Sequence, residues 1–231
     1  MILRKYYIDF LLLSIFLLLI SCKKENQHLI KNTGKTNFYE IIFEDKDKNK
    51  NIYRQSYYFL QNKNNSITVL KNDGDIVVFS QKNNGISKTN ISNSQPIDYD
   101  RILQNHDLKR IVAFPIKEGM EWQTDDMTTI KLIMGFDRIY KTDLPFRLNN
   151  KIVKTNETIN VNGRKIKNCI EISSNGNASF IPGPPLDKIK IEVTSRTWYT
   201  KDLGIVRYER KEKSDSATTG NIYYSRTLLL E

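Results

Sequence analysis

The residues on either side of Asn162-Gly163 constrain the fold of this chain more than any other stretch. Asn-Gly favours a two-residue β-hairpin turn because both of its residues accept a positive φ. Pairing across the turn predicts a hairpin over residues 152–172 with one mostly apolar face. The predicted pairs on that face are Val161–Arg164, Ile159–Ile166 and Val153–Ile172.

The second face of this predicted hairpin is polar. Its residues are Lys154, Asn156, Thr158, Asn160, Lys165, Lys167, Cys169 and Glu171. A one-residue slip in the pairing would exchange the two faces, so the pattern itself supports the register. We therefore expect Cys169 on the polar side, where it is either exposed or covered by another element.

Further β-prone segments, separated by turn residues, run along most of the chain. The predicted strands cover residues 38–43, 52–60, 66–70, 75–80, 85–92, 128–140, 188–199, 205–213 and 221–230. Asp73-Gly74 predicts a tight hairpin turn, and Gly204 predicts a turn with positive φ. The clearest alternation of apolar and charged side chains lies in residues 188–199.

Other segments depart from this pattern. Residues 96–110 predict one short helix, and residues 111–122 predict a loop that enters a strand at Trp122. Residues 175–186 predict a second loop, because their prolines cannot supply a central strand ladder. The strand over residues 128–140 is either single or a pair that bends at Gly135.

Consecutive strands joined by short turns predict an antiparallel sheet. A sheet of about ten strands must curl or close, because a long flat sheet leaves unpaired edges. The predicted fold class is all-β, or mainly β with one or two short helices. The predicted architecture is a strongly curved antiparallel sheet or a half-open β-barrel, with the helix of residues 96–110 against its concave side.

The first 21 residues predict a secretory signal peptide. Arg4 and Lys5 lie in a short polar start, and residues 10–20 form an apolar run that only Ser14 interrupts. That run is about half the roughly 20 residues that a transmembrane helix needs. We therefore expect the segment to direct export and not to remain as a membrane span.

Leu19-Ile20-Ser21-Cys22 resembles the lipobox of bacterial lipoproteins. In that family the leader is cut before the cysteine, the thiol receives a diacylglyceryl group, and the new amine is often acylated, for example with palmitate. The resemblance implies lipidation of Cys22 and stable anchoring to a membrane. Lys23 stands where an aspartate favours inner-membrane retention in proteobacteria, so the resemblance favours the outer membrane.

The predicted organisation has three parts. A signal peptide covers residues 1–21, a lipidated flexible tether residues 22–36, and a single antiparallel β domain residues 37–231. The tether is polar and has no hydrophobic periodicity, which is typical of a flexible linker. Cys22 and Cys169 are the only cysteines, so an acylated Cys22 leaves the domain without a disulfide.

The formal net charge of +10 would draw the protein to anionic head groups or other polyanions. Lysine and asparagine are abundant along the whole chain, which favours a general compositional bias over a dedicated basic patch as the source of the charge. We expect no nucleic-acid partner, because an exported lipoprotein seldom meets one.

Three short segments together resemble a loose group of uncharacterised bacterial exported lipoproteins. They are Pro115-x-x-x-Gly119-x-x-Trp122, Gly163-x-x-x-Asn168-Cys169-Ile170-x-Ile172 and Trp198-Tyr199-x-x-x-x-Gly204-Ile205-Val206-x-x-Glu209. The resemblance spans residues 111–210 and implies an antiparallel β body, similar to the open barrels of the lipoprotein-sorting chaperones. It implies no active site.

Aromatic residues supply the candidate binding groups. Trp122, Trp198 and Tyr199 are either ligand contacts or core anchors, because a buried aromatic ring removes a large apolar area from water. The tyrosines of the strands either stack on a ligand or reflect strand propensity. They include Tyr53, Tyr57, Tyr58, Tyr223 and Tyr224.

The remaining polar residues form no recognisable catalytic motif. Cys169 is either a reactive thiol near lysines or an inert thiol under a covering element. Two acidic pairs lie in predicted loops, where solvated turns are the simpler interpretation than a cation site. They are Asp45 with Asp47 and Asp125 with Asp126. With His28 and His106 as the only histidines, we predict no catalytic residue, no metal and no cofactor.

These observations support three functional hypotheses. The first is a membrane-anchored, non-enzymatic envelope lipoprotein that serves as a scaffold or as a binding module for an envelope component or a hydrophobic ligand. The second is a surface-exposed lipoprotein that interacts with the environment or a host. The third is a hydrolase built on loop residues. The first predicts an apolar cavity on the concave face if the ligand is a lipid.

Overall fold

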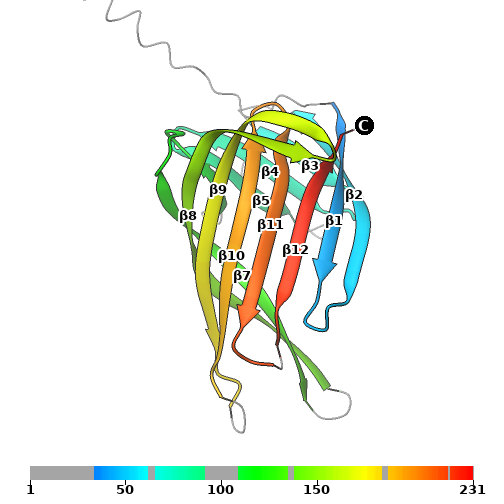
Figure 1. Cartoon of the computed structure of the whole chain (residues 1–231), viewed down its shortest axis with the longest axis vertical. Coiled ribbons are helices and arrows are strands. Elements are labelled where there is room, and N and C mark those ends of the chain that lie inside the picture. The colour runs from blue at the N-terminus through cyan, green and yellow to red at the C-terminus, as the bar shows by residue number, and fades with distance from the viewer. Residues whose placement is uncertain are drawn as a thin grey trace, which may run out of the picture.

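The protein, as described by a computed structural model, is a single curved sheet. The structure describes residues 34–61, 66–91, 109–134, 138–183, 187–217 and 219–230. These residues form twelve antiparallel strands that wrap into a nearly closed barrel (Figure 1), which confirms the predicted all-β class. Within the described ranges there is no helix with the length and apolar character that crossing a membrane requires.

The strands follow one another along the chain as two meanders. The first runs through β1 (Thr36–Glu44), β2 (Lys50–Gln61), β3 (Ser66–Lys71), β4 (Ile76–Lys82), β5 (Gly85–Ile91) and β6 (Lys109–Ala113). The second runs through β7 (Glu121–Met134), β8 (Arg138–Val161), β9 (Arg164–Phe180), β10 (Ile189–Thr200), β11 (Gly204–Ser214) and β12 (Ile222–Leu229). The first and last strands pair with each other, so the sheet order is β6-β5-β4-β3-β2-β1-β12-β11-β10-β9-β8-β7.

The predicted turns are confirmed. Asn162 and Gly163 both have positive φ, 50° and 81°, as a two-residue hairpin between twisted strands requires. Gly74 has a φ of 88° and Gly204 a φ of 74°, so each glycine occupies a conformation that other residues adopt with strain. These turns depend on local chemistry, and the sequence therefore predicts them well.

The predicted register of the β8–β9 hairpin is wrong beyond its first pairs. Ile152, not Val153, pairs with Ile172, and Val153 is 39% exposed. The ladder shifts at three points, and Asn168 adopts a positive φ of 57°. Such irregularities add an unpaired residue and bend the strand. The strict two-residue period therefore fails in this part of the hairpin.

The bent hairpin covers one end of the sheet. Figure 1 shows the β8–β9 turn arching over the upper ends of β10, β11 and β12, and the Asn162 side-chain amide donates a 3.2 Å hydrogen bond to the carbonyl of Leu228. Cys169 is fully buried in this region, in one apolar cluster with Val161 and Trp198. The covered alternative for Cys169 is therefore correct.

Several predicted boundaries differ from the structure. Most of the helix predicted over residues 96–110 lies outside the described residues, and its last two residues begin β6. The loop predicted over residues 111–122 starts later, because β6 extends to Ala113. The loop predicted over residues 175–186 also starts later, since β9 extends to Phe180.

The strand alternation sorts side chains between solvent and the barrel interior. In β10, Ile189, Ile191 and Val193 are buried while the lysine and glutamate between them are exposed, as predicted. The predicted segment over residues 128–140 contains the end of β7 and the start of β8, so the version with two strands is correct. The interior carries apolar layers at both ends and, between them, a row of polar residues.

The edges of the sheet, β6 and β7, meet without a backbone ladder among the described residues. Side chains of β7 join them instead. The indole nitrogen of Trp122 donates a 3.1 Å hydrogen bond to the carbonyl of Arg110, and Asp126 forms a 2.7 Å ion pair with Lys109. This side-chain seam converts an open curved sheet into a nearly closed barrel around an interior space.

Candidate ligand-binding site

The barrel interior is hollow in its middle. A cavity of about 420 Å³, called the cationic cavity below, lies between the two meanders. Its lining includes six cationic side chains and two carboxylates. They are Lys71, Lys88, Lys109, Arg110, Arg210 and Arg226, with Asp73 and Asp126. A cavity of this size and polarity falls in the range of small-molecule sites.

A second space, called the end cavity below, has a volume of about 810 Å³. It lies by the β1–β2 turn and the β11–β12 connection, at the lower end in Figure 1. Its apolar lining consists of Phe43, Met127, Ile130, Ile191 and Ile222. Tyr208, Arg210 and Tyr224 line both cavities, so the two spaces adjoin at these three residues.

The polar residues reach the interior because they occupy inward positions of otherwise apolar rows. In β12, Arg226 stands between Tyr224 and the buried Leu228 at two-residue spacing. In β5, Lys88 follows the buried Ile86 at the same spacing. Successive inward positions differ by two residues in a strand, so these charges point to the same side as the core.

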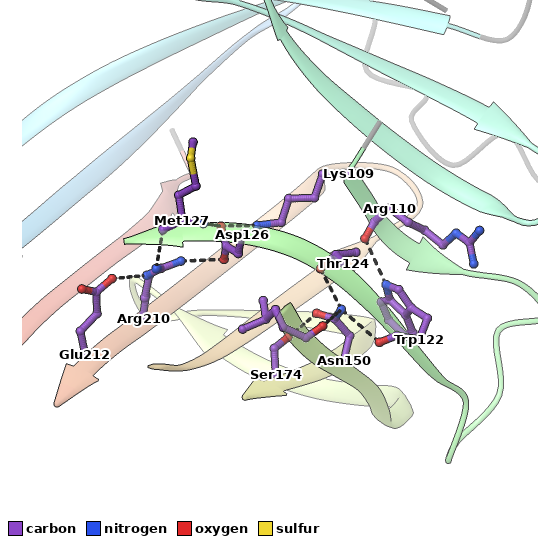
Figure 2. Close-up of polar contacts among 11 residues, drawn as sticks. Lys109, Arg110, Trp122, Thr124, Asp126, Met127, Asn150, Ser174, Arg210 and Glu212 are labelled. Carbon is purple, nitrogen blue, oxygen red and sulfur yellow. Dashed lines mark hydrogen bonds and ion pairs between the residues drawn. The ribbon is translucent and has the colours of Figure 1, made fainter. Parts of the chain in front are cut away.

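A chain of ion pairs crosses the barrel (Figure 2). Asp126 of β7 contacts Lys109 at 2.7 Å and Arg210 of β11 at 2.8 Å. Arg210 in turn contacts Glu212 at 2.7 Å and donates a 2.9 Å hydrogen bond to the carbonyl of Met127. Because β7 and β11 lie four places apart in the sheet, this chain braces distant walls of the barrel.

The electrostatics of this brace keep its groups charged. Burial acts to raise the pKa of Asp126, but the adjacent Lys109 and Arg210 outweigh burial and hold that pKa below its ordinary value. Burial likewise acts to lower the pKa of Arg210, and Tyr208, Glu212 and Asp126 more than compensate. Asp126 and Arg210 are therefore both charged at neutral pH, and they form an ion pair.

Lys88, Arg110 and Arg226 are different, because none of them forms an ion pair with a carboxylate in the described part of the chain. Arg226 donates a 2.8 Å hydrogen bond to the hydroxyl of Tyr57, and its guanidinium lies 5.2 Å from the centre of the Tyr57 ring and 5.3 Å from that of Tyr39. Cation–π contacts of this kind hold a guanidinium in place without neutralising it.

Lys88 has a perturbed ionisation. Burial, followed by repulsion from Lys109 and Arg226, lowers its pKa to about 7. Asp126 acts in the opposite direction and Lys71 in the same direction, with smaller effects. An amine in this state exchanges its proton near neutral pH, so the charge of the cavity depends on pH.

Hydrogen-bonding groups complete the wall opposite these cations. The side-chain amide of Asn150 donates to the Thr124 hydroxyl at 3.0 Å and to the Trp122 carbonyl at 3.2 Å, and its oxygen accepts from Ser174 at 2.8 Å (Figure 2). Asn150 and Ser174 both line the cationic cavity. Their mutual hydrogen bonds fix this wall in one arrangement.

The three aromatic residues that the sequence singled out lie in the core and not in the cavity linings. Trp122 and Tyr199 share one buried apolar cluster, which also contains Ile152. Trp198 belongs to the cluster of Cys169, and its indole nitrogen donates a 2.9 Å hydrogen bond to Glu157. The described parts of both cavities are lined by other residues.

Other predicted candidates are dispersed. Burial raises the pKa of Cys169 to about 11, which opposes thiolate formation. Asp45 and Asp47 lie in the β1–β2 turn, as predicted, whereas Asp125 and Asp126 lie in β7 and not in a loop. Over the described ranges, no three or more His, Cys, Asp or Glu side chains are grouped as metal ligands require.

Sequence reasoning missed the residues that give the cavity its charge. Of the tyrosines considered, Tyr53, Tyr57 and Tyr224 line the cationic cavity, but Lys88 and Arg226 were not singled out. The sequence signal that could have identified them is a cation in an alternating row of apolar residues, such as Tyr224-x-Arg226-x-Leu228. Because the barrel interior is partly polar, such a row resembles the solvent-facing side of a strand.

Comparison with protein-family models, with curated proteins and with solved structures gave no match for this chain. What the cavities can bind therefore follows from their own side chains.

Proposed function

We propose that the protein is a lipid-anchored bacterial envelope lipoprotein, exported and held at Cys22, whose barrel binds a small molecule of the envelope without enzymatic action. The anchor follows from the resemblance of Leu19-Ile20-Ser21-Cys22 to a lipobox. The binding role follows from the interior of the barrel. Because a diacylglyceryl group and an amide-linked chain anchor a protein stably, the binding domain would work at the membrane surface.

The observation that supports binding most strongly is the unfilled interior. Adjoining spaces of about 420 and 810 Å³ lie along the barrel, and both fall in the size range of small-molecule sites. The end cavity is open to solvent, since Met127 in its lining is 61% exposed.

The end cavity supports a ligand with an apolar portion. Phe43, Met127, Ile130 and Ile222 present carbon surface to it, and Lys46 and Asp47 lie at its rim near the turns. Each buried methylene contributes about 0.8 kcal/mol to transfer from water, so an alkyl or aryl group of modest size gains enough to bind. This fits the hypothesis of a hydrophobic envelope ligand.

A fluorescent apolar probe tests the binding role. N-phenylnaphthylamine gains emission when it leaves water, and we expect the purified domain to raise its emission saturably. Ile222→Trp fills the end cavity and should lower the affinity roughly tenfold or more through overlap with the probe. Lys213→Trp adds the same ring to an exposed position of neighbouring β11 and should leave binding unchanged. Equal binding by both variants would contradict an interior site.

A further inference from the structure

We propose that the cationic cavity binds a phosphate-type oxyanion between Lys88 and Arg226, as the head group of a ligand whose apolar part occupies the end cavity. The head-group assignment deepens the proposed binding function and rests on it. It derives from the cavity lining and from the pairing of its charges. Both cations line the same cavity, Lys88 from β5 and Arg226 from β12.

The charges of the cavity do not cancel. Lys71 forms a 2.7 Å ion pair with Asp75, and Asp126 and Glu212 together balance the charges of Lys109 and Arg210. Asp73 accepts a hydrogen bond from Gln55. Three lining cations therefore remain without an ion-pair partner among the described residues, namely Lys88, Arg110 and Arg226, and the charge of Arg226 opposes protonation of Lys88. Buried charges of one sign are stable only when a counter-charge accompanies them.

The remaining donors suit an oxyanion with several acceptor oxygens. One nitrogen of the Arg226 guanidinium is bonded to Tyr57, while its Nε is buried without a hydrogen-bond acceptor. The Lys88 ammonium brings three donors, and none of them is bonded to a described residue. The Tyr53 side chain also lines the same wall. Lysine and arginine together are the usual ligands of phosphate groups.

The size of the charge favours phosphate over a single carboxylate. Lys88 and Arg226 together match a phosphate monoester, which carries about −1.5 to −2 charges at neutral pH, and Arg110 is a third lining cation without an ion pair among the described residues. The cavity of about 420 Å³ exceeds the volume of a lone phosphate ion and adjoins the end cavity at Tyr208, Arg210 and Tyr224, which line both spaces. A phosphate attached to an organic group uses both spaces, and inorganic phosphate uses only one.

Isothermal titration calorimetry at about pH 6 and low salt tests this assignment with three probes. Inorganic phosphate reports on the oxyanion site alone, octyl phosphate on the site with an attached chain, and octanoate on a single carboxylate. We expect octyl phosphate to bind most tightly, inorganic phosphate to bind measurably, and octanoate to bind more weakly than octyl phosphate. Tight octanoate binding without phosphate binding would overturn the phosphate assignment.

Variants of Lys88 test which residues hold the anion. Lys88→Met should lower the affinity for inorganic phosphate at least roughly tenfold, and Lys88→Arg should retain it, since both charge and donors remain. Lys213→Met removes one exposed lysine from the outer face of β11 and serves as the matched control. Equal loss in Lys88→Met and Lys213→Met would show that only overall charge matters and would overturn the proposal.

Stability separates loss of the site from loss of the fold. Without phosphate, Lys88→Met should be more stable than the wild type, because an unpaired buried charge is gone. Phosphate should raise the melting temperature of the wild type and leave that of Lys88→Met unchanged. N-phenylnaphthylamine binding should persist in Lys88→Met. If no phosphate probe binds while this apolar probe still does, the oxyanion site is rejected and the interior binding role stands.

Discussion

Arg226 contacts the buried tyrosines of the core and also lines the cationic cavity. Its guanidinium lies against both Tyr39 and Tyr57, whose rings contact each other with centres 4.7 Å apart. Burial acts to lower the pKa of Arg226, but the neighbouring tyrosine hydroxyls outweigh it, so the guanidinium stays charged. Burial also raises the pKa of Tyr39, which keeps that hydroxyl neutral. The charge in the interior is therefore permanent at Arg226 and adjustable at Lys88.

The titration of Lys88 should appear in the stability of the free protein. Its pKa is about 7 when folded and 10.5 ordinarily, so the unfolded chain binds more protons between these values. Unfolding free energy therefore rises with pH from about 7 to about 10 through this group. Urea unfolding of wild type and Lys88→Met across this range should show the larger rise in the wild type. Identical pH profiles would contradict a buried, unpaired amine.

Cys169 should react slowly in the folded protein. Its thiol is fully buried and has a pKa of about 11, so the thiolate fraction at pH 8 falls roughly 100-fold relative to an ordinary cysteine. Iodoacetamide labelling followed by mass spectrometry should give slow modification in buffer and rapid modification in denaturant. Labelling of the folded domain at the rate of a free thiol would mean that the β8–β9 hairpin leaves Cys169 accessible.

At the scale of elements, the β8–β9 hairpin does most to shape the interior. Its strands are the longest pair of the sheet, and its irregular ladder bends the tip over the ends of β10, β11 and β12. Farther along, Gly176 lets β9 pass closely against β8. A Cβ at this position would stand 2.5 Å from the carbonyl oxygen of Arg147 and 2.8 Å from the ring of Phe146.

Gly176→Ala should therefore destabilise the domain. The added methyl group meets backbone on one side and a ring in the core on the other, so we expect a loss of about 2 kcal/mol in unfolding free energy. Asn177→Ala changes the adjacent, exposed position and should cost far less. Urea denaturation of the two variants makes the comparison. Equal stabilities would show that β8 and β9 approach less closely.

The elements also show what sequence alone could predict. Turns at Asn162-Gly163 and Gly74 depend on residues within the turn, and alternation in β10 depends on residues of one strand. The irregular pairing between β8 and β9 near Asn168 accompanies the bend of this hairpin over β10 and β11. The local sequence contains no pattern that predicts this bend. Lys88 was missed for the same reason, since its inward position becomes informative only when other strands bring further charges beside it.

At the scale of the whole molecule, the barrel is closed by a brace and a seam that share Asp126. This carboxylate joins the sheet edges through Lys109 and spans the interior through Arg210. Its removal would weaken both the contact between the sheet edges and the brace across the interior. The linear order of the sheet alone would leave β6 and β7 as free edges in the described part of the chain.

Asp126→Asn should cost about 3 kcal/mol of stability, because the partly buried Lys109 loses its ion-pair partner and Arg210 keeps only Glu212. Part of that loss should disappear when Lys109→Met is combined with it, since the stranded charge of Lys109 is then absent. A double-mutant cycle by chemical denaturation measures this coupling. Additive effects of the two substitutions would contradict a direct interaction across the seam.

Native mass spectrometry of protein extracted from the membranes of its own organism tests both the lipid anchor at Cys22 and the binding of a small molecule in the barrel. The account predicts a chain that begins at Cys22, carries acyl groups, and retains a phosphate-bearing small molecule that Ile222→Trp protein lacks. A chain with an intact, unacylated amino terminus would contradict the anchor. An acylated chain that never carries a small molecule, and that binds neither the apolar probe nor phosphate, would contradict the binding barrel.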